Sequence, residues 1–384
     1  MHFQLTEEQL MIQKAARDFA QQQCKPGVIE RDEQQKFPRE QIMQLAELGF
    51  MGMMVDPAYG GAGMDTVSYV LAMEEISKID ASISVCMSVN NSLVCWGLQT
   101  YGNEAQKQQY LTPLAQGRKD GELYIGAFLL SEPEAGSDAT SQQTTAEDMG
   151  DYFLLNGTKN WITNGNSASV YLVMAQTDPA KGSHGITAFI VEKNWPGVTV
   201  GAKENKMGIR ASDTHSILFN DVKVPRENII KDIGFGFAFA MKTLAGGRIG
   251  IASQALGITS GAYELSLEYS RQRKAFGKEI MYHQAIQFKL ADMATRVEAA
   301  RLLCLKAAWE KDNGIDYTLS SSIAKVFASE AAMWISTEAV QVHGGYGYVK
   351  EYHVERLMRD AKITQIYEGT SEVQRIVIGR QILK

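Results

Sequence analysis

The chain has 384 residues, of which 45% are apolar and 21% charged, and its formal net charge is −6. It is long enough to bury a sizeable core in two or three domains, and its acidic balance argues against nucleic-acid binding, which needs a basic surface. No run of eighteen apolar residues is present, so no membrane span is expected. The amino terminus carries Glu7 and Glu8 in place of a basic segment followed by an apolar one, which disfavours a signal peptide.

The cysteines and histidines point away from disulfides and metal ions. The four cysteines are widely spaced and form no CxxC pair, so we expect reduced, mostly buried thiols of a cytoplasmic protein. The histidines show neither HxxxH nor HExxH spacing, and no metal site is predicted. Any redox chemistry would therefore need an organic cofactor.

Residues 1–118 show helical periodicity and are predicted to form an amino-terminal helical domain. The apolar positions that carry this periodicity are Leu10, Ala15, Phe19, Ile42, Leu45 and Leu48.

Residues 119–229 have a different character. Their apolar segments are short, rich in β-branched and aromatic residues, and separated by Gly, Asn, Asp and Pro. The clearest are Tyr152–Leu155, Tyr171–Ala175, Ile186–Val191 and Ser216–Phe219. This pattern predicts a middle domain built on a small antiparallel β-sheet.

Residues 230–384 contain no proline, since the last of the eight prolines is Pro225. Long uninterrupted helices are therefore possible. An apolar stripe in alternating four- and three-residue steps runs through Ile286, Leu290, Met293, Val297, Ala300, Cys304 and Ala307. Asn313 and Gly314 supply a helix end. The predicted fold class is α+β, with a carboxy-terminal domain that resembles a four-helix bundle.

Five motifs make the sequence specific. They are LLSEPEAGSDA (Leu129–Ala139), TKNWITNG (Thr158–Gly165), RKAFGK (Arg273–Lys278), QVHGGYGYVKEYHVERLMRD (Gln341–Asp360) and IYEGTSEVQR (Ile366–Arg375). In this order and at this spacing they resemble the signatures of the acyl-CoA dehydrogenase family over most of the chain. Two further stretches, Met87–Leu93 and Gly247–Ile258, are most similar to the short-chain, butyryl-CoA-type members. The resemblance implies the same helical, sheet and helical domains.

Glu368, in IYEGT, is the residue that the resemblance identifies as the catalytic base. The α-proton of a thioester is weakly acidic, so its removal needs a positioned carboxylate and stabilisation of the developing enolate. By resemblance, the backbone N–H of Glu368 helps to hold the thioester carbonyl. We expect burial to raise the pKa of Glu368 and the nearby helix start to lower it. The alternative is an ordinary glutamate before a helix.

The resemblance also implies FAD as the cofactor. Trp161 would flank the isoalloxazine, Thr163 would bind near N5, and Ser131 would bind the pyrimidine edge. Other implied flavin contacts in this region are Phe128, Leu130, Ser137 and Ile162. Ser137 would also touch the CoA. Each of these residues could instead serve only packing or turn formation.

A second group of residues is implied to bind the dinucleotide part of FAD, in part on a neighbouring subunit. Its members are Arg273, Phe276, Gln284, Gln341, Val342, Gly344 and Gly345. Arginine suits a pyrophosphate because its fork donates two parallel charge-assisted bonds. No GxGxxG motif follows a predicted strand, so a Rossmann domain is not supported. A homotetramer formed as a dimer of dimers is expected.

The segment after Glu368 reads as a helix start. Ser371 and Gln374 fit an S-x-x-Q capping box, and helix amino termini also bind anions. The resemblance places FAD phosphates here, with Thr370 and Glu372 as contacts.

The implied substrate contacts are Ser137, Ala245, Arg248, Gln254, Thr364 and Gly369. Ala245 departs from the family pattern, because many members carry an aspartate there that binds the pantetheine. Leu129 is larger than is usual at its position. Gln254 and Thr364 fall where short-chain relatives close the acyl pocket, although Gln254 could instead bind another helix. Ser84 disfavours a glutaryl-CoA decarboxylase, in which an arginine stands there.

The implied reaction removes the α-proton with Glu368 while the β-hydrogen leaves as hydride to flavin N5, which yields trans-2-enoyl-CoA. Electrons would pass to an electron-transferring flavoprotein. Three alternatives remain: the reverse reaction as an enoyl-CoA reductase, an oxygen-activating relative, and a non-catalytic acyl-CoA-binding helical protein.

Overall fold

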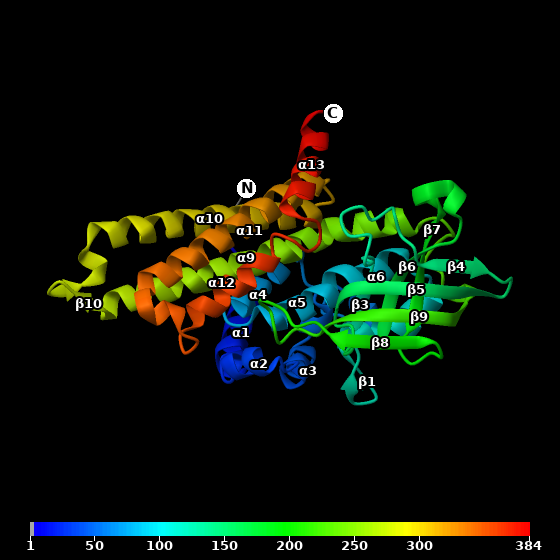
Figure 1. Cartoon of the computed structure of the whole chain (residues 1–384), viewed down its shortest axis with the longest axis horizontal. Helices are drawn as coiled ribbons and strands as arrows, with labels where there is room; N and C mark the ends of the chain where they lie inside the picture. The colour runs from blue at the N-terminus through cyan, green and yellow to red at the C-terminus, as the bar shows by residue number, and fades with distance from the viewer. Residues whose placement is uncertain (1–3) are drawn as a thin grey trace.

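The computed structural model describes residues 4–384, and it places a β-sheet domain beside a long helical body (Figure 1). Residues 1–3, part of the segment that disfavours a signal peptide, lie outside the described residues. The amino-terminal helices are α1 (Glu7–Phe19), α2 (Val28–Gln34), α3 (Arg39–Glu47), α4 (Thr66–Ser77), α5 (Ala81–Ser88), α6 (Trp96–Tyr101), α7 (Glu104–Gln106) and α8 (Thr112–Gln116). Thr6 begins α1 with a capping box to Gln9.

The continuous helical stretch Ala81–Tyr101 joins α5 to α6 through a π-helical segment, Val89–Cys95. It is long and apolar enough to cross a membrane, but 94% of its most apolar window is buried inside the fold, as in a core helix. Asn90 and Asn91 interrupt its apolar run. Their side-chain amides donate to the carbonyls of Met51 and Phe50, both at 2.8 Å, so the polar groups are satisfied inside the core.

The middle domain contains the sheet. Its strands are β3 (Gly126–Leu129), β4 (Thr145–Asp148), β5 (Tyr152–Thr163), β6 (Val170–Gln176), β7 (Ile186–Glu192), β8 (Val198–Lys203) and β9 (Thr214–Pro225), preceded by the hairpin of β1 (Arg118–Lys119) and β2 (Glu122–Leu123). The strand order is β3-β6-β4-β5-β9-β8, with β7 paired to β6. All four predicted strand segments are present, and two of the strands, β5 and β9, extend well beyond them.

The sheet is mixed and not purely antiparallel as predicted. β3 pairs with β6 in parallel, and so does β4 at Thr145 and Gln176. The other pairings in this sheet are antiparallel. The sequence pattern of a strand records which face is buried and not which neighbour it takes, so long-range parallel pairing could not be foreseen.

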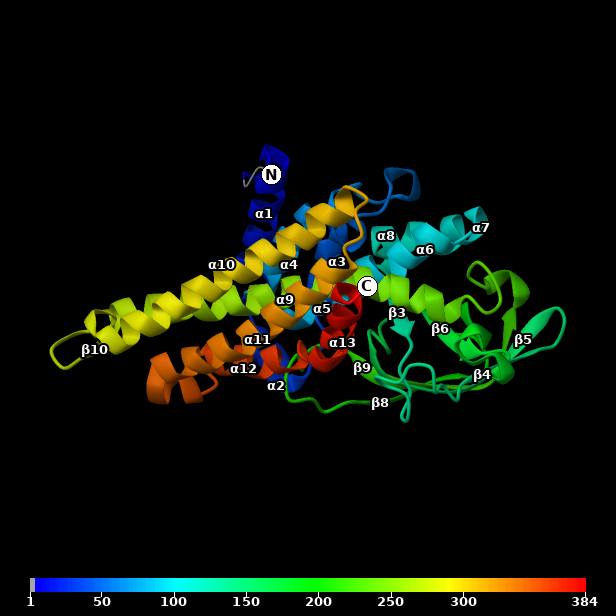
Figure 2. The ribbon, with the colours of Figure 1, turned by 90° about the horizontal axis from the view of Figure 1, so that it is seen from above.

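The carboxy-terminal domain is helical, as predicted. It comprises α9 (Gly236–Gln272), the two-residue strands β10 (Lys274–Ala275) and β11 (Lys278–Glu279), α10 (Gln284–Asp312), α11 (Thr318–His343), α12 (His353–Ile363) and α13 (Ser371–Ile382). α9 to α12 pack side by side, whereas α13 projects from the body (Figures 1 and 2). The predicted stripe on α10 is buried from Met293 to Ala307, and Asn313 ends the helix before Gly314 at φ 68°.

Two apolar clusters unite the parts. One joins the bundle to the sheet and to α5–α6, where the ring of Phe239 on α9 stacks on that of Phe128 on β3 at 6.1 Å. The other joins α1, α3 and α4 to the opposite side of the sheet. All four cysteines are free and buried, as predicted. The α+β fold class is therefore confirmed, with α9 running between the sheet and the far end of the bundle (Figure 2).

Candidate active site

Glu368 lies in the short loop between α12 and α13, with its carboxyl group directed at α9. Its backbone is left-handed, with φ 52°, and Gly369 follows at φ 91°. A Cβ atom on Gly247 of α9 would collide with Oε2 of Glu368. Glycine at position 247 therefore makes room for this carboxyl group.

The Glu368 carboxyl group has unusual electrostatics. Burial raises its pKa to about 7, and the positive charges of Lys325 and Arg248 oppose this rise. Its buried Oε2 has no hydrogen-bond partner among residues 4–384. A carboxyl group that titrates near neutrality and has a free oxygen is suited to proton transfer.

Arg248 stands one residue after Gly247 and is buried. Its Nη1 donates to Oγ of Ser322 at 3.3 Å, while its Nε has no partner among the described residues. Burial lowers its pKa, and the negative charge of Glu368 opposes this. An unpaired donor and an unpaired acceptor thus share one region, where a polar ligand could satisfy both.

Gln254 and Thr364 are both fully buried near Glu368. Nε2 of Gln254 donates to the carbonyl of Ala81 at 2.8 Å and to Oγ of Ser84 at 3.3 Å, and its Oε1 accepts from the hydroxyl of Tyr367. Gln254 does bind another helix, α5, which was the alternative interpretation of this residue. The bond from Tyr367 also holds Gln254 next to the residue that precedes Glu368. Ala245 is buried on the same helix, one turn before Ile249.

The predicted flavin contacts meet where β5 adjoins the LLSEPEAGSDA loop. The amide of Asn160 donates to the carbonyl of Ser131 at 2.9 Å. Trp161, at φ 62° in a β-bulge, has 62% of its surface exposed although it is a large aromatic residue, whereas Ile162 is buried. Ser137 lies exposed on the loop.

Lys159 belongs to the TKNWITNG motif, and the sequence offers no reason to assign it a role. In the structure it anchors the LLSEPEAGSDA loop. It is fully buried, and its Nζ donates to Glu132 at 2.7 Å, to Gln142 Oε1 at 3.0 Å and to the carbonyl of Leu130 at 3.1 Å. Burial lowers the pKa of Lys159 to about 8, and Glu132 opposes this. The ring of Phe128, by contrast, is partly buried and stacks on the ring of Phe239.

The start of α13 differs from its predicted form. Thr370 and not Ser371 is the N-cap, with its hydroxyl accepting from the amide of Val373 at 3.3 Å. Gln374 does not close a capping box. Its Nε2 instead donates to the carbonyls of Glu368 and Gly369. The S-x-x-Q pattern places the cap one residue too late, because Thr370 and Ser371 are adjacent and both residue types are favoured caps.

A second cluster of predicted residues forms a cavity of about 710 Å³ at the far end of the bundle. Its lining includes Arg273 and Phe276 from one segment and Val342, Gly344 and Gly345 from another. The two segments lie about 70 residues apart in the sequence. Gln284 and Gln341 are exposed at neighbouring helix ends and do not line it. β10, which contributes Ala275 to this cavity, and α13, which follows the loop of Glu368, lie at separate places in both ribbon views (Figures 1 and 2).

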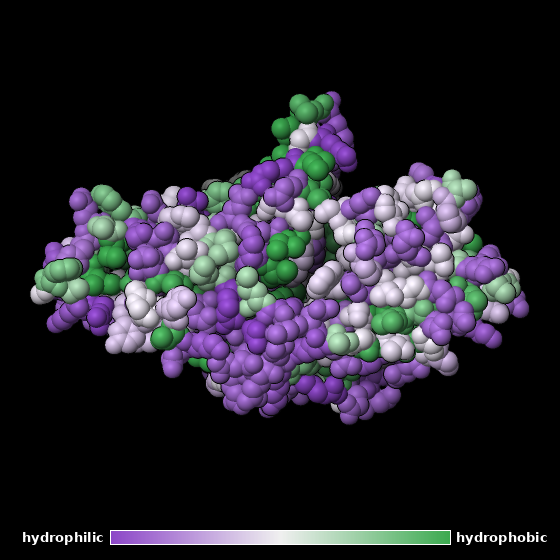
Figure 3. Space-filling view, viewed as in Figure 1, coloured by the Kyte–Doolittle hydropathy of each residue, from purple (hydrophilic) through white to green (hydrophobic). Residues whose placement is uncertain are grey.

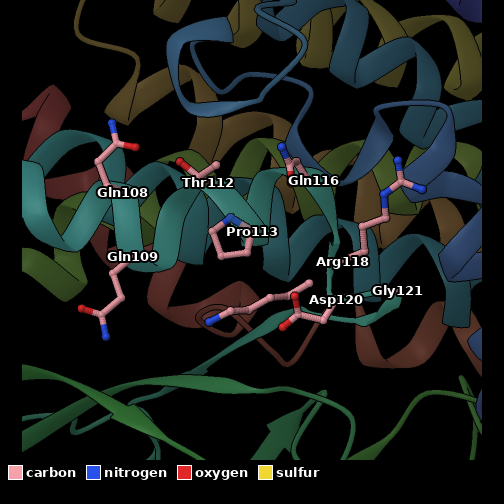
Figure 4. Close-up of a pocket in the computed structure, with 9 residues that line it drawn as sticks. Gln108, Gln109, Thr112, Pro113, Gln116, Arg118, Asp120 and Gly121 are labelled. Atoms are coloured by element: carbon pink, nitrogen blue, oxygen red, sulfur yellow. The ribbon is translucent and has the colours of Figure 1, made fainter.

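A further open pocket of about 650 Å³ lies between α8 and the β1–β2 hairpin (Figure 4). It is lined by Gln108, Gln109, Thr112, Pro113, Gln116, Arg118, Lys119, Asp120 and Gly121. None of the predicted site residues belongs to it. Among residues 4–384, no group of three or more His, Cys, Asp and Glu side chains is placed to hold a metal ion.

The order of the three parts and the enclosed carboxyl group define a class of enzyme. Three family models match in sequence: Acyl-CoA dehydrogenase, N-terminal domain (residues 6–118), middle domain (residues 127–222) and C-terminal domain (residues 234–383). The chain therefore belongs to the acyl-CoA dehydrogenase family, whose members are oxidoreductases that act on CH–CH bonds.

Within the family, the chain is similar to short-chain members, as its motifs predicted. It is 50% identical to the short-chain specific acyl-CoA dehydrogenase of Megasphaera elsdenii and 47% identical to that of Clostridium acetobutylicum, each over the whole of both chains. The solved butyryl-CoA dehydrogenase of M. elsdenii superimposes with a TM-score of 0.97 at 49% identity, covering both chains completely. A chain from a structure described as the electron transferring flavoprotein of Acidaminococcus fermentans superimposes with a TM-score of 0.98 at 49% identity and the same coverage.

Proposed function

We propose that the protein catalyses FAD-dependent α,β-dehydrogenation of a short-chain acyl-CoA to trans-2-enoyl-CoA, with Glu368 as the base. The observation that carries this proposal is the Glu368 carboxyl group, whose raised pKa and unpaired Oε2 (unpaired within residues 4–384) suit it to accept a proton beside α9. The similarity to enzymes described as short-chain specific supports the choice of substrate.

The chemistry of the predicted residues suits FAD and acyl-CoA. The exposed indole of Trp161 offers an aromatic face, the loop of Ser131 adjoins the same strand β5, and the start of α13 offers polar groups. When bound, FAD would accept the β-hydrogen of the substrate as hydride. Glu368 takes the α-proton, and Arg248 adds a positive charge that favours the ionised form of Glu368. A hollow lies below α13 between the bundle and the sheet (Figure 3).

The test is a spectrum of the purified protein. It should be yellow, contain FAD, and lose its flavin absorbance when butyryl-CoA is added without oxygen. A protein that carries flavin and keeps its absorbance with butyryl-, hexanoyl- and octanoyl-CoA would contradict the proposed substrate class. A colourless protein that binds no added FAD would favour a non-catalytic acyl-CoA-binding protein.

We propose that an electron-transferring flavoprotein is the physiological acceptor. The similarity to a chain from the structure described as the electron transferring flavoprotein of A. fermentans supports this. Transfer of electrons from butyryl-CoA to such a flavoprotein, followed by its absorbance, tests the proposal. The four buried free thiols fit a reducing compartment, and a cytoplasmic location is part of the proposal.

We propose that the acyl pocket prefers chains of four to six carbons and that Gln254 and Thr364, both fully buried, close its end. Each buried methylene normally contributes about 0.8 kcal/mol, whereas insertion into a packed wall costs about 1–3 kcal/mol. Gln254→Ala combined with Thr364→Ala should therefore move the optimum of kcat/KM to longer chains. Ser253→Ala is the control, because the hydroxyl of Ser253 donates only to the carbonyl of Ile249 in the same helix. An octanoyl-CoA optimum in the wild type would show that Gln254 and Thr364 do not limit the length of the acyl chain.

Flavin binding should be shared between two subunits. The proposal is supported by the distance between the Glu368 region and the cavity at Arg273, and by the 96% exposed side chain of Phe276 beside that cavity. α13 also carries exposed Ile376 and Ile382, and hydrophobic residues lie beside hydrophilic ones on its projecting end (Figure 3). We expect a tetramer built from dimers.

Arg273→Ala should release flavin and weaken the oligomer together, whereas Arg271→Ala, an exposed arginine at the same end of α9, should change neither. Flavin content and sedimentation measure the two effects. A monomer that keeps FAD at high dilution would contradict the proposal.

A further inference from the structure

The geometry points to Lys325 and Gln374 as positioning residues that fix the backbone of Glu368 and Gly369, an inference that rests on the proposed role of Glu368 as the base. Neither residue was assigned this role from the sequence. Lys325 lies on α11 and Gln374 on α13, so the loop that carries Glu368 is held from two separate helices.

The backbone of this loop needs to be held. Glu368 and Gly369 are consecutive residues with positive φ, at 52° and 91°. An L residue such as glutamate adopts the left-handed conformation at a cost in free energy, and it stays there only where its surroundings hold it. Glycine at 369 avoids a second cost, and a Cβ there would lie 2.6 Å from Nε2 of Gln374.

Three hydrogen bonds to two successive carbonyls supply this restraint. Nζ of Lys325 donates to the carbonyl of Gly369 at 2.8 Å. Nε2 of Gln374 donates to the carbonyl of Glu368 at 3.1 Å and to that of Gly369 at 3.0 Å. Both donor side chains are fully buried, whereas Glu368 and Gly369 are half-buried, so the donors hold the loop from its inner side. The direction of the Glu368 side chain is therefore set by groups that do not touch its carboxyl group.

Lys325 also acts through its charge. The charged groups near it are Glu368, Arg248 on α9 and Glu372 on α13. Its positive charge favours the ionised form of Glu368 and, with Arg248, opposes the rise in pKa that burial causes. Tyr69 and Tyr367 also lie close to the Glu368 charge. Burial lowers the pKa of Lys325 itself to about 8, so at pH 7 it still carries its charge. Gln374 is neutral and can act only through the hydrogen bonds.

This difference between the two residues gives a sharp test on the FAD-loaded enzyme. The measurement is the rate of flavin reduction by butyryl-CoA in a single turnover, from pH 5.5 to 9. Lys325→Met should raise the apparent pKa of the rate by about one unit or more, the size expected for loss of a nearby opposite charge. Gln374→Leu should lower the rate at every pH and leave the apparent pKa in place. Lys325→Arg should restore the apparent pKa.

The controls separate this inference from the proposed function. Lys14→Met makes the same chemical change at an exposed position on α1 and should match the wild type. Activity retained in Glu368→Gln would overturn the proposed function. If that variant is inactive while Lys325→Met and Gln374→Leu keep the wild-type rate and pH profile, the positioning role alone is wrong. If Lys325→Met does not fold, Gln374→Leu decides, because this inference predicts a lower rate for it at every pH: a wild-type rate in Gln374→Leu contradicts the inference.

Discussion

Glu368→Gln is expected to retain flavin and bind acyl-CoA yet lose nearly all flavin reduction by butyryl-CoA. Glutamine has almost the same shape as glutamate but cannot accept the α-proton. A general base contributes about 10²–10⁴-fold, and the loss should reach at least this range if no other group replaces it. Stopped-flow absorbance measures the rate. Glu47→Gln, at an exposed position on α3, is the control. More than about half of the wild-type rate in Glu368→Gln would show that another group acts as the base.

The pH dependence of the wild-type enzyme checks the same assignment independently. Only the ionised form of Glu368 can accept a proton. Because burial raises the pKa of Glu368 to about 7, the rate of flavin reduction should rise with pH through about that value and then level off. A rate that is already maximal at pH 5 would be inconsistent with the enclosed carboxyl group as the base.

Lys159→Ala should strongly destabilise the protein and weaken flavin binding. The substitution leaves Glu132 as a buried carboxylate without its cation, and breaking one side of a buried ion pair typically costs about 3–5 kcal/mol. The loop that carries Ser131 also loses the contact to the carbonyl of Leu130. Thermal and urea unfolding measure the free energy of unfolding, and fluorescence of released FAD measures the binding.

Lys181→Ala is the matched control. Lys181 pairs with Asp178 at 2.8 Å, but both side chains are exposed. Exposed pairs contribute about 0–1 kcal/mol, so this variant should unfold nearly like the wild type. Equal stability of Lys159→Ala and Lys181→Ala would show that the buried pair does not hold the loop.

The helical and sheet layout could be predicted from the sequence because it is written in local patterns. The absence of proline after Pro225 and the stripe from Met293 to Ala307 led to the bundle, and short β-branched runs led to the sheet. The parallel pairing of β3 with β6 could not be predicted, because it depends on chain segments more than 40 residues apart. Motifs also placed Glu368, Arg248 and Gln254 in one site, and the structure brings them around α9 and the α12–α13 loop.

The residues that hold the site were harder to find than those that form it. Lys159 and Lys325 would normally be read as solvated lysines, and their burial depends on tertiary contacts. The sequence did contain a hint that Lys325 is buried. It is the only charged residue in the segment Ser320–Ser329, whose other residues are serine or apolar. Gln374 fits the pattern of a capping box, in which its side chain would accept from a backbone amide. In the structure its Nε2 instead donates to the carbonyls of Glu368 and Gly369, which the pattern does not predict.

The continuity of α9 restricts how this protein can change. The helix runs without interruption from Gly236 to Gln272, so it carries Gly247 beside Glu368 and ends next to Arg273 at the distant cavity. Insertion of a single residue between these points would turn everything beyond it by about 100° and advance it by about 1.5 Å. Arg273 would then face another direction, and the buried side of the helix would rotate towards solvent. The length and phase of α9 are therefore fixed, whereas the exposed turn at Gly150 between β4 and β5 has room for insertions.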